Sequence, residues 1–292
     1  MGAEWTATLM LCGIYSMTAI ATQLGMMCGA FSLAPIGWMA IGAYAAALGA
    51  TRWMVGGFEA LLIALAVAAL LGPVVMLPVR RISGLYFALV SLAFVLVIQS
   101  VVSHLEYTGG ALGIFGVPLD TDLPVVVAAL VLSAAAAAFL SSGRRGRALR
   151  AAGQDAIVAQ AMGVDVFRLQ LAVGAVGAVI AAASGFLYAG YIGYVDPTQF
   201  GFSLVVQIIV MVIVGGRGSW VGAIIGACFI TMLPLVLRPL AEWRDVFNGA
   251  LLIAVVLLLP GGLVEMAKLT LRRARPAPAA ALRPSLANEE SR

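Results

Sequence analysis

The sequence predicts an all-α, polytopic membrane protein, a helical bundle of about nine spans. Hydrophobic residues make up 63% of the 292 residues and charged residues only 10%, far below the roughly 25% charged residues of soluble domains. The uncharged runs are also much longer than the ~10 residues of a transmembrane β-strand. Because a helix satisfies its own backbone hydrogen bonds inside a bilayer, we expect the runs to be helices.

Charged side chains divide the chain into uncharged runs that can each cross a bilayer as a helix of about 20 residues. The run between Glu4 and Arg52 needs two helices, with a break expected at residues 25–29. The later runs cover residues 60–79, 82–103, 123–143, 169–195, 198–216, 218–237 and 246–264. The N-terminus lacks a basic region and a small-residue cleavage site, so we expect a first span there, not a cleaved signal peptide.

The domain boundaries follow from the same pattern. We expect a transmembrane domain over residues 1–271, with a cytoplasmic loop at 143–168. Residues 272–292 are rich in Pro and Ala and lack an apolar face, so we expect a disordered cytoplasmic tail.

The arginines predict the orientation of the chain, because Lys and Arg concentrate in cytoplasmic loops. An arginine cluster in loop 143–168 places that loop in the cytoplasm; its members are Arg144, Arg145, Arg147 and Arg150. Alternation of the spans then puts Arg80, Arg81, Arg217 and the C-terminus on the cytoplasmic side. The N-terminus, Arg52, Glu106, Asp120, Asp122 and Asp196 are expected on the outer side.

Loop 143–168 is the longest charged segment between apolar runs, and it shows a helical pattern. Small and apolar residues recur at spacings of three or four, namely Leu149, Ala152, Ala156, Ala159 and Gly163. Gly163 is expected to end this helix, and Asp165 to cap the next one. Two interpretations are open: the helix lies at the interface and holds lipid phosphates with its arginines, or a soluble partner docks on it.

The polar side chains inside the spans are neutral. No ionisable residue lies in the middle of a span, and His104, the only histidine, lies at the end of one; this disfavours a proton-coupled carrier. The polar residues inside spans include Thr18, Thr22, Gln23, Ser32, Ser91, Gln99 and Gln207. Each can serve a helix–helix hydrogen bond, whereas Ser32, Ser91, Gln207 and the aromatic Tyr86 lie near breaks and are the candidates to line a solute path. Small residues at helical spacing predict close helix contacts at Gly25/Gly29, Gly174/Ala178, Gly185/Ala189 and Gly222/Gly226.

The sequence contains no recognised motif for enzymatic or metal chemistry. The sequence has no HExxH, GxSxG or CxxC and no paired carboxylates within a span. Lys268, the only lysine, follows Ala267 and not a glycine, which excludes a phosphate-binding loop. Cys12, Cys28 and Cys228 lie in apolar runs and are expected to be packed thiols. The net charge of +4 does not suggest nucleic acid. We therefore expect no cofactor on this chain and, if ATP is used, its hydrolysis on another chain.

Seven stretches, in order along nearly the whole chain, resemble the LivM-type permease subunits of branched-chain amino acid ABC importers. They are GAFSLAPIGWMAIGAYAAAL (29–48), RRISGLYFALVSLAF (80–94), TGGALGIFGVP (108–118), GRALRA with AQAMGVDVFR (146–168), FLYAGYIGYVDPTQF (186–200), VGGRGSWVGAIIGA (214–227) and LLLPGGL (257–263). The chain departs from the family pattern at Ala30, Ala34 and Pro35, where polar residues or Gly are usual. It also departs at Gly153, Gln154, Ala156 and Gln160, in a stretch that is usually charged.

The resemblance implies an ABC importer permease fold in a bacterial inner membrane. It implies a second, homologous permease of the LivH type, two ATP-binding subunits that hold ATP and Mg, and a substrate-binding protein outside. Loop 143–168 would then couple the permease to the ATPase. The expected solute is a branched-chain amino acid, with urea, an amide or an aromatic acid as alternatives in the same architecture. The alternative from another class is a carrier or channel that needs no ATPase.

Overall fold

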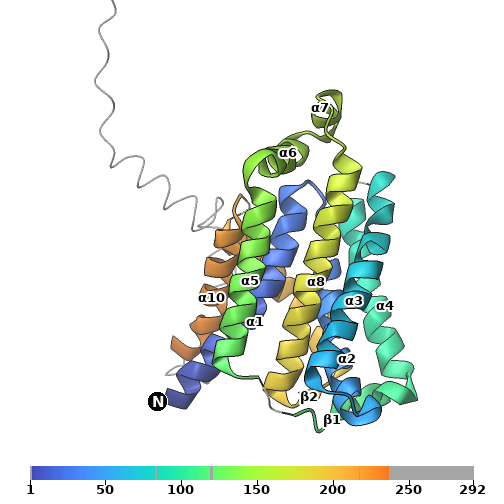
Figure 1. The fold of residues 1–292 in the computed structure, drawn as a ribbon, viewed down its shortest axis with the longest axis vertical. Coiled ribbons are helices and arrows are strands. Elements are labelled where there is room, and N and C mark those ends of the chain that lie inside the picture. Colours follow the sequence, from blue (N-terminus) through green and yellow to red (C-terminus); the bar gives the residue numbers. More distant parts are fainter. Residues whose placement is uncertain (1, 83, 119–120, 217, 237–292) are drawn as a thin grey trace, which may run out of the picture.

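A computed structural model describes residues 2–82, 84–118, 121–216 and 218–236 of the chain. In this part most helices run between the two ends of a bundle (Figure 1). The predicted span at 246–264, the boundary at residue 271, the tail 272–292 and the cytoplasmic C-terminus lie outside the described residues, as do Asp120 and Arg217.

Six helices in the described part are long and apolar enough to cross a membrane. They comprise α1 (Gly2–Met27), α2 (Ala34–Leu48, continued by the π-helix η1, Gly49–Trp53), α3 (Gly57–Met76), α4 (Leu85–His104), α5 (Leu123–Ser141) and α8 (Val166–Ile192). Each corresponds to a predicted span. The break between α1 and α2 covers residues 28–33 and overlaps the end of the predicted break at 25–29. Pro35 lies in the first turn of α2, where its missing N–H leaves no bond unmade.

Two predicted spans form a bent pair instead of two straight crossings. The chain axis bends by 120° between helix α9 (Phe202–Gly215) and helix α10 (Trp220–Val236). With 14 residues, α9 is about 21 Å long, shorter than the ~30 Å hydrocarbon core. The described part therefore contains six spans, or seven if the pair counts as one, so the prediction of about nine is approximate. Runs of uncharged residues show apolar length, but they do not show where the axis turns.

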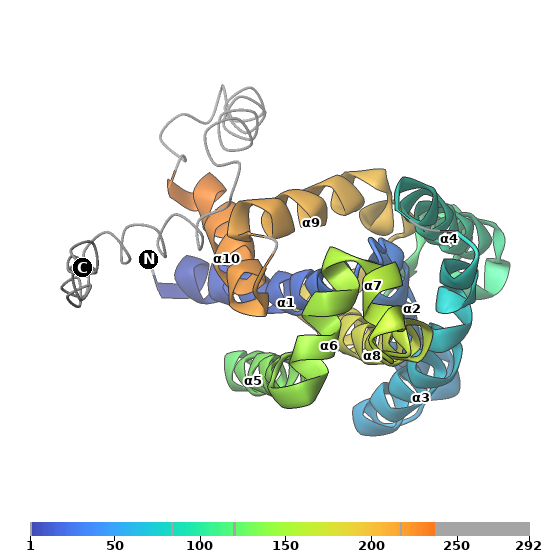
Figure 2. The same ribbon diagram turned by 90° about the horizontal axis from the view of Figure 1, so that it is seen from above.

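Helices α1, α2 and α8 form the centre of the bundle, and α3, α4 and α5 lie around them (Figure 2). The apolar windows of α2, α1 and α8 are 83%, 72% and 61% buried, whereas those of α3, α4 and α5 are at most 28% buried. Glycine permits the central contact, because Gly42 of α2 lies against the carbonyl of Ala182 and Gly185 of α8 lies against the carbonyl of Met39. Gly222 and Gly226 of α10 lie in the same way against the carbonyls of Gly215 and Met211 of α9, so the predicted close contacts at Gly185, Gly222 and Gly226 are confirmed.

A small antiparallel sheet covers the end of the bundle that carries the acidic loops. We call this end the β-sheet end. Strand β1 (Ile114–Phe115) pairs with β2 (Tyr194–Val195), joining the loop after α4 to the loop after α8. Three 3-10 helices complete this end: η3 (Glu106–Thr108), η4 (Gly110–Leu112) and η5 (Pro197–Phe200). Gly109 and Gly113 have φ of +78° and +75°, with carbonyls so close that a Cβ would overlap them, which explains the glycines of the TGGALGIFGVP stretch.

The opposite end carries two short helices, α6 (Gly143–Gln154) and α7 (Ala156–Ala161), which project beyond the spans (Figure 1). We call it the α7 end. The 3-10 helix η2 (Leu77–Arg80), which follows α3, lies at this end too. The described arginines of loop 143–168 therefore lie opposite Glu106, Asp122 and Asp196, as the alternation of spans predicts.

Candidate functional site

Helix α6 packs across the connection between α1 and α2. Its Leu149 side chain is fully buried in the main core. Gly153 lies against the carbonyl of Met27, and Gly29, with φ of +78°, lies against the carbonyl of Ala152. Backbone therefore meets backbone at this contact, which ties α6 firmly to the break between two central helices.

Helix α7 exists because Asp155 interrupts the helical pattern of loop 143–168. The Asp155 carboxylate accepts hydrogen bonds from the backbone N–H groups of Ile157 and Val158 at 2.9 and 3.1 Å, the geometry of an N-cap. The loop thus forms two helices, where the spacing alone indicated one. The other expectations are confirmed: Gly163, with φ of +84°, follows the end of α7, and Asp165 caps α8 by accepting from the Arg168 N–H at 3.0 Å.

The face of α7 that points away from the protein differs from the predicted one. Leu149, Ala152 and Ala159 are at most 3% exposed, so their side chains pack inside the chain and hold α6 and α7 in place. Ala156 is half-buried and Gly163 is exposed. The exposed apolar side chains are Ile157 (80%), Val158 (50%) and Met162 (79%). We call these three the α7 tip. The spacing of three or four selected small residues that pack inward. Apolar side chains in an otherwise charged loop would have been the better signal for the exposed face.

The cap at Asp155 gives a prediction about this segment. Asp155→Ala should destabilise α7 by about 1 kcal/mol, because two N–H groups lose their acceptor. We expect faster amide exchange at Ile157 and Val158, measured by hydrogen–deuterium exchange of the purified protein. Asp155→Asn is the matched control, since its amide oxygen can still accept. Equal exchange in wild type and Asp155→Ala would contradict the role of the cap.

Two of the predicted path residues have structural roles. The Ser91 hydroxyl accepts a hydrogen bond from the Leu33 N–H and donates one to the Ala88 carbonyl, both at 2.9 Å. The Ser32 hydroxyl accepts from the Ala34 N–H at 3.3 Å. Both side chains are 1% exposed. The Ser91 bond holds the start of α2 against α4. The Ser32 bond is local to the start of α2, and Ser32 borders only a small cavity beside α8.

The other two candidates are accessible. Tyr86 is 74% exposed at the α7 end of α4, a position that suits an aromatic residue at the membrane surface. Gln207 is half-buried on α9. Ser32 and Ser91 are buried and Tyr86 lies at the end of its helix. Gln207 is therefore the candidate that presents an accessible amide from within a helix of the bundle.

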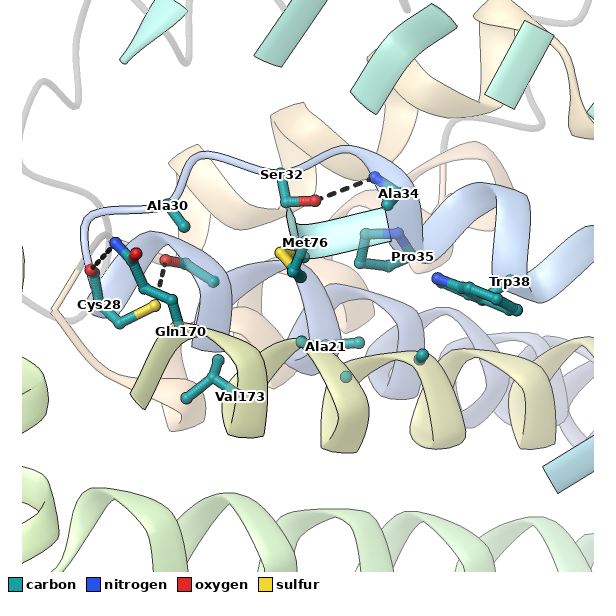
Figure 3. A pocket seen from close by; sticks show the side chains of 14 residues that line it. Ala21, Cys28, Ala30, Ser32, Ala34, Pro35, Trp38, Met76, Gln170 and Val173 are labelled. Atoms are coloured by element: carbon teal, nitrogen blue, oxygen red, sulfur yellow. Dashed lines mark hydrogen bonds between the residues drawn. The ribbon is translucent and has the colours of Figure 1, made fainter. Parts of the chain in front are cut away.

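A small cavity lies between the α1–α2 connection and α8 (Figure 3). Ala30, Ala34 and Pro35 line it, together with Gln170, whose amide donates to the Cys28 carbonyl at 3.3 Å. Its free volume of about 10 Å³ is close to the space of one water molecule. The positions at which the chain departs from the family pattern in this region therefore surround a nearly filled space that has no room for a solute.

Further polar side chains on α1 form hydrogen bonds between helices, which is one of the two roles expected for polar residues inside the spans. Thr18 and Ser184 share a hydrogen bond of 2.5 Å between their hydroxyls. The Gln23 amide donates to the carbonyl of Gly216, at the bend between α9 and α10, at 3.4 Å. Gln23 is fully buried, and its Oε1 has no hydrogen-bond partner among the described residues. This bond ties the α9–α10 bend to the central helix α1.

Residues 5–256 match the family model described as "Branched-chain amino acid transport system / permease component". The chain belongs to this family. The matched region contains nearly all of the described helical bundle, from α1 through the α9–α10 pair. Family membership and the six long apolar helices make this permease a multi-pass inner-membrane protein.

Individual relatives agree with the family. The permease is 27% identical to the high-affinity branched-chain amino acid transport system permease protein LivM of Salmonella typhimurium, over 87% of this chain and 70% of the relative. It is 31% identical to LivH of the same organism over 43% of this chain and 41% of the relative. It is also 33% identical to the autoinducer 2 import system permease protein LsrC of an Enterobacter species, over 46% of this chain and 42% of the relative. No solved structure matches the chain.

Proposed function

We propose that this chain is the transmembrane permease subunit of an ABC importer that carries a branched-chain amino acid, or a similar small amphipathic solute, into the cytoplasm. ATP hydrolysis on two partner subunits, which hold the ATP and Mg, would drive the transport. The other proposed partners are a second, LivH-type permease and a substrate-binding protein on the outer side. The LivM and LivH relatives support the choice of amino acid and of a second permease.

The observation that carries this proposal is the α7 tip. Ile157, Val158 and Met162 expose apolar surface on a short helix that projects beyond the spans, next to the arginines of α6. Four basic side chains favour the cytoplasmic side for this end. A helix that lies on the lipid surface would need its apolar face directed at the bilayer, whereas α7 projects away from the spans. An apolar tip that reaches into the cytoplasm fits a groove on a soluble partner, here the ATPase, and a standalone carrier has no need of it.

The contacts of α6 support a route by which motion of α7 would reach the centre of the bundle. Gly153 and Gly29 join α6 to the α1–α2 connection through close backbone contacts. The two segments could not slide past each other without first separating. Helix α8 begins a few residues after α7, and Asp165 caps it. A partner that displaces α7 would therefore tilt α1, α2 and α8 together, which can turn the solute path from one side of the membrane to the other.

The test is solute-stimulated ATPase activity of the whole complex. The chain would be co-expressed with the subunits encoded beside it, reconstituted with the binding protein, and exposed to leucine, isoleucine, valine, urea and benzoate. Stimulation by the branched-chain amino acids alone is the expected result. Absence of any associated ATPase would overturn the ABC mechanism and leave a standalone carrier or channel.

The second candidate function is import of a different solute by the same architecture. The LsrC relatives favour testing solutes other than branched-chain amino acids, because their name assigns them to autoinducer 2 import. Stimulation by urea or benzoate and not by leucine would support this candidate. The solute would then be decided by residues outside the small cavity of Figure 3, because that cavity has no room for any member of the panel.

A further inference from the structure

We propose that one face of α9, carrying Ser203 and Gln207, forms with Gln99 of α4 a hydrogen-bonding wall of the solute path. This inference rests on the proposed function and names the side chains that would bind the solute. All three residues lie toward the β-sheet end, since α9 starts at Phe202 just after η5. No ionisable side chain takes part.

Burial in the first half of α9, residues 202–209, distinguishes two faces. Leu204, Val205 and Ile208 on one face are at most 6% exposed, and they pack into the core of the bundle. Ser203 is exposed and Gln207 is half-buried. Because these two are four residues apart, they lie one above the other on the same face of the helix. The described chain thus directs two polar side chains of a membrane helix away from its own core.

Polar side chains in membrane helices rarely face hydrocarbon, where their hydrogen bonds would be unmade. Neither Ser203 nor Gln207 has a hydrogen bond to another residue of the described part through its side chain. This contrasts with Ser91, Ser133 and Ser184, whose hydroxyls are bonded within the bundle. A surface that supplies water or a polar ligand therefore lies opposite this face of α9.

Gln99 extends the wall onto a second helix. The amide of Gln99 lies beside Gly201, where a Cβ would come within 3.0 Å of its Nε2 atom. Gly201 immediately precedes α9, so the Gln99 side chain lies beside the first turn of α9. Gln99 is itself half-buried. Glycine at 201 leaves the room that the amide occupies, and a larger residue would displace it.

Two amides and a hydroxyl suit a solute that has both donors and acceptors. An amide N–H can donate to a carboxylate, and an amide oxygen or a hydroxyl can accept from an ammonium group. Neutral partners bind such groups less strongly than a buried opposite charge would, so the solute can leave again. The apolar neighbours Phe202, Val206 and Ile209, each exposed or half-buried, would contact an aliphatic side chain. An amino acid with an apolar side chain matches this combination.

The test is accessibility to water in the complete complex. Cys12, Cys28 and Cys228 would first be replaced, and single cysteines then introduced as Ser203→Cys and Gln207→Cys. Leu132→Cys, on a 73%-exposed position of α5, is the lipid-facing control, and Leu204→Cys is the buried control on α9 itself. We expect a charged, membrane-impermeant thiol reagent to modify positions 203 and 207 about tenfold faster, or more, than position 132, since hydrocarbon excludes the charged reagent. Leucine should slow the modification of position 207.

Reaction at 203 and 207 as slow as at 132 would overturn the inference and assign this face to lipid. Modification that occurs only when the second permease is omitted would overturn it too, because the face would then be a dry contact between subunits. This readout does not need ATPase stimulation. A wet face at 203 and 207 together with a failed ATPase panel would refute the proposed solute and leave the path in place.

A second measurement tests the hydrogen bond itself. Gln207→Leu should raise the KM for uptake about tenfold, because the amide can no longer bind the solute's polar groups, while Gln207→Asn should keep most of the affinity. Ser100→Ala on the exposed face of α4 is a control that should leave KM unchanged. Equal KM values for wild type and Gln207→Leu would remove Gln207 from the path.

Discussion

Gly185→Leu should prevent the stable packing of α8 against α2. A side chain at this position would overlap the carbonyl of Met39, which belongs to the backbone of a buried helix and cannot rotate away. Gly42 packs in the same way against the carbonyl of Ala182, so the two helices touch through backbone at two points. Overpacking typically costs 1–3 kcal/mol, and we expect the upper end of this range, about 3 kcal/mol, because the central helices have no free side to move into.

The measurement is the melting temperature and the size-exclusion profile of the detergent-solubilised chain. Gly57→Leu at the start of α3 is the matched control, since nothing lies within 4 Å of a Cβ at that position. We expect loss of the monodisperse peak for Gly185→Leu and a normal profile for Gly57→Leu. Equal melting temperatures for both variants would show that α2 and α8 can separate without cost.

Ile157→Asp combined with Met162→Asp should uncouple the permease from its ATPase while leaving the bundle folded. Both side chains are about four-fifths exposed, so their replacement removes no internal contact. In the complex, each aspartate would place a charge in an apolar contact. Burying polar groups without partners costs several kcal/mol, and we expect solute-stimulated ATPase activity to fall at least about tenfold, which corresponds to ~1.4 kcal/mol.

Gln154→Asp is the control for added charge, because Gln154 is exposed at the end of α6 and is not one of the three apolar residues of the α7 tip. Ala159→Asp is a different kind of variant. Ala159 is 2% exposed and packs with Ala152 and Val166, so an aspartate there should disrupt the α6–α7 unit itself and lower its thermal stability. Stimulation at the wild-type level in the double variant, with normal protein yield, would exclude the α7 tip from docking.

The sequence predicted the accessibility of the path candidates less well than the helix ends of loop 143–168. Ser32 and Ser91 were selected because they lie near breaks, but a break also exposes backbone N–H groups that need acceptors. Serine supplies those acceptors locally, as the bond from Leu33 to Ser91 shows. A polar residue near a break is therefore ambiguous until its neighbours in space are known. Gln207 became the stronger candidate only when the core-facing side of α9 was identified.

The sequence by itself determined the membrane class, the six long spans of the described part, the two charged ends, and the roles of Gly163 and Asp165 at helix ends in loop 143–168. These properties depend on apolar length, charge and local backbone bonds, which act between residues that are close in the chain. The tertiary structure alone decided which face of each helix is buried, that α9 and α10 bend by 120°, and that the α7 tip is formed by Ile157, Val158 and Met162. These features depend on contacts between distant segments, such as Gly153 with Met27, and the small residues that allow such contacts look alike on every face of a helix.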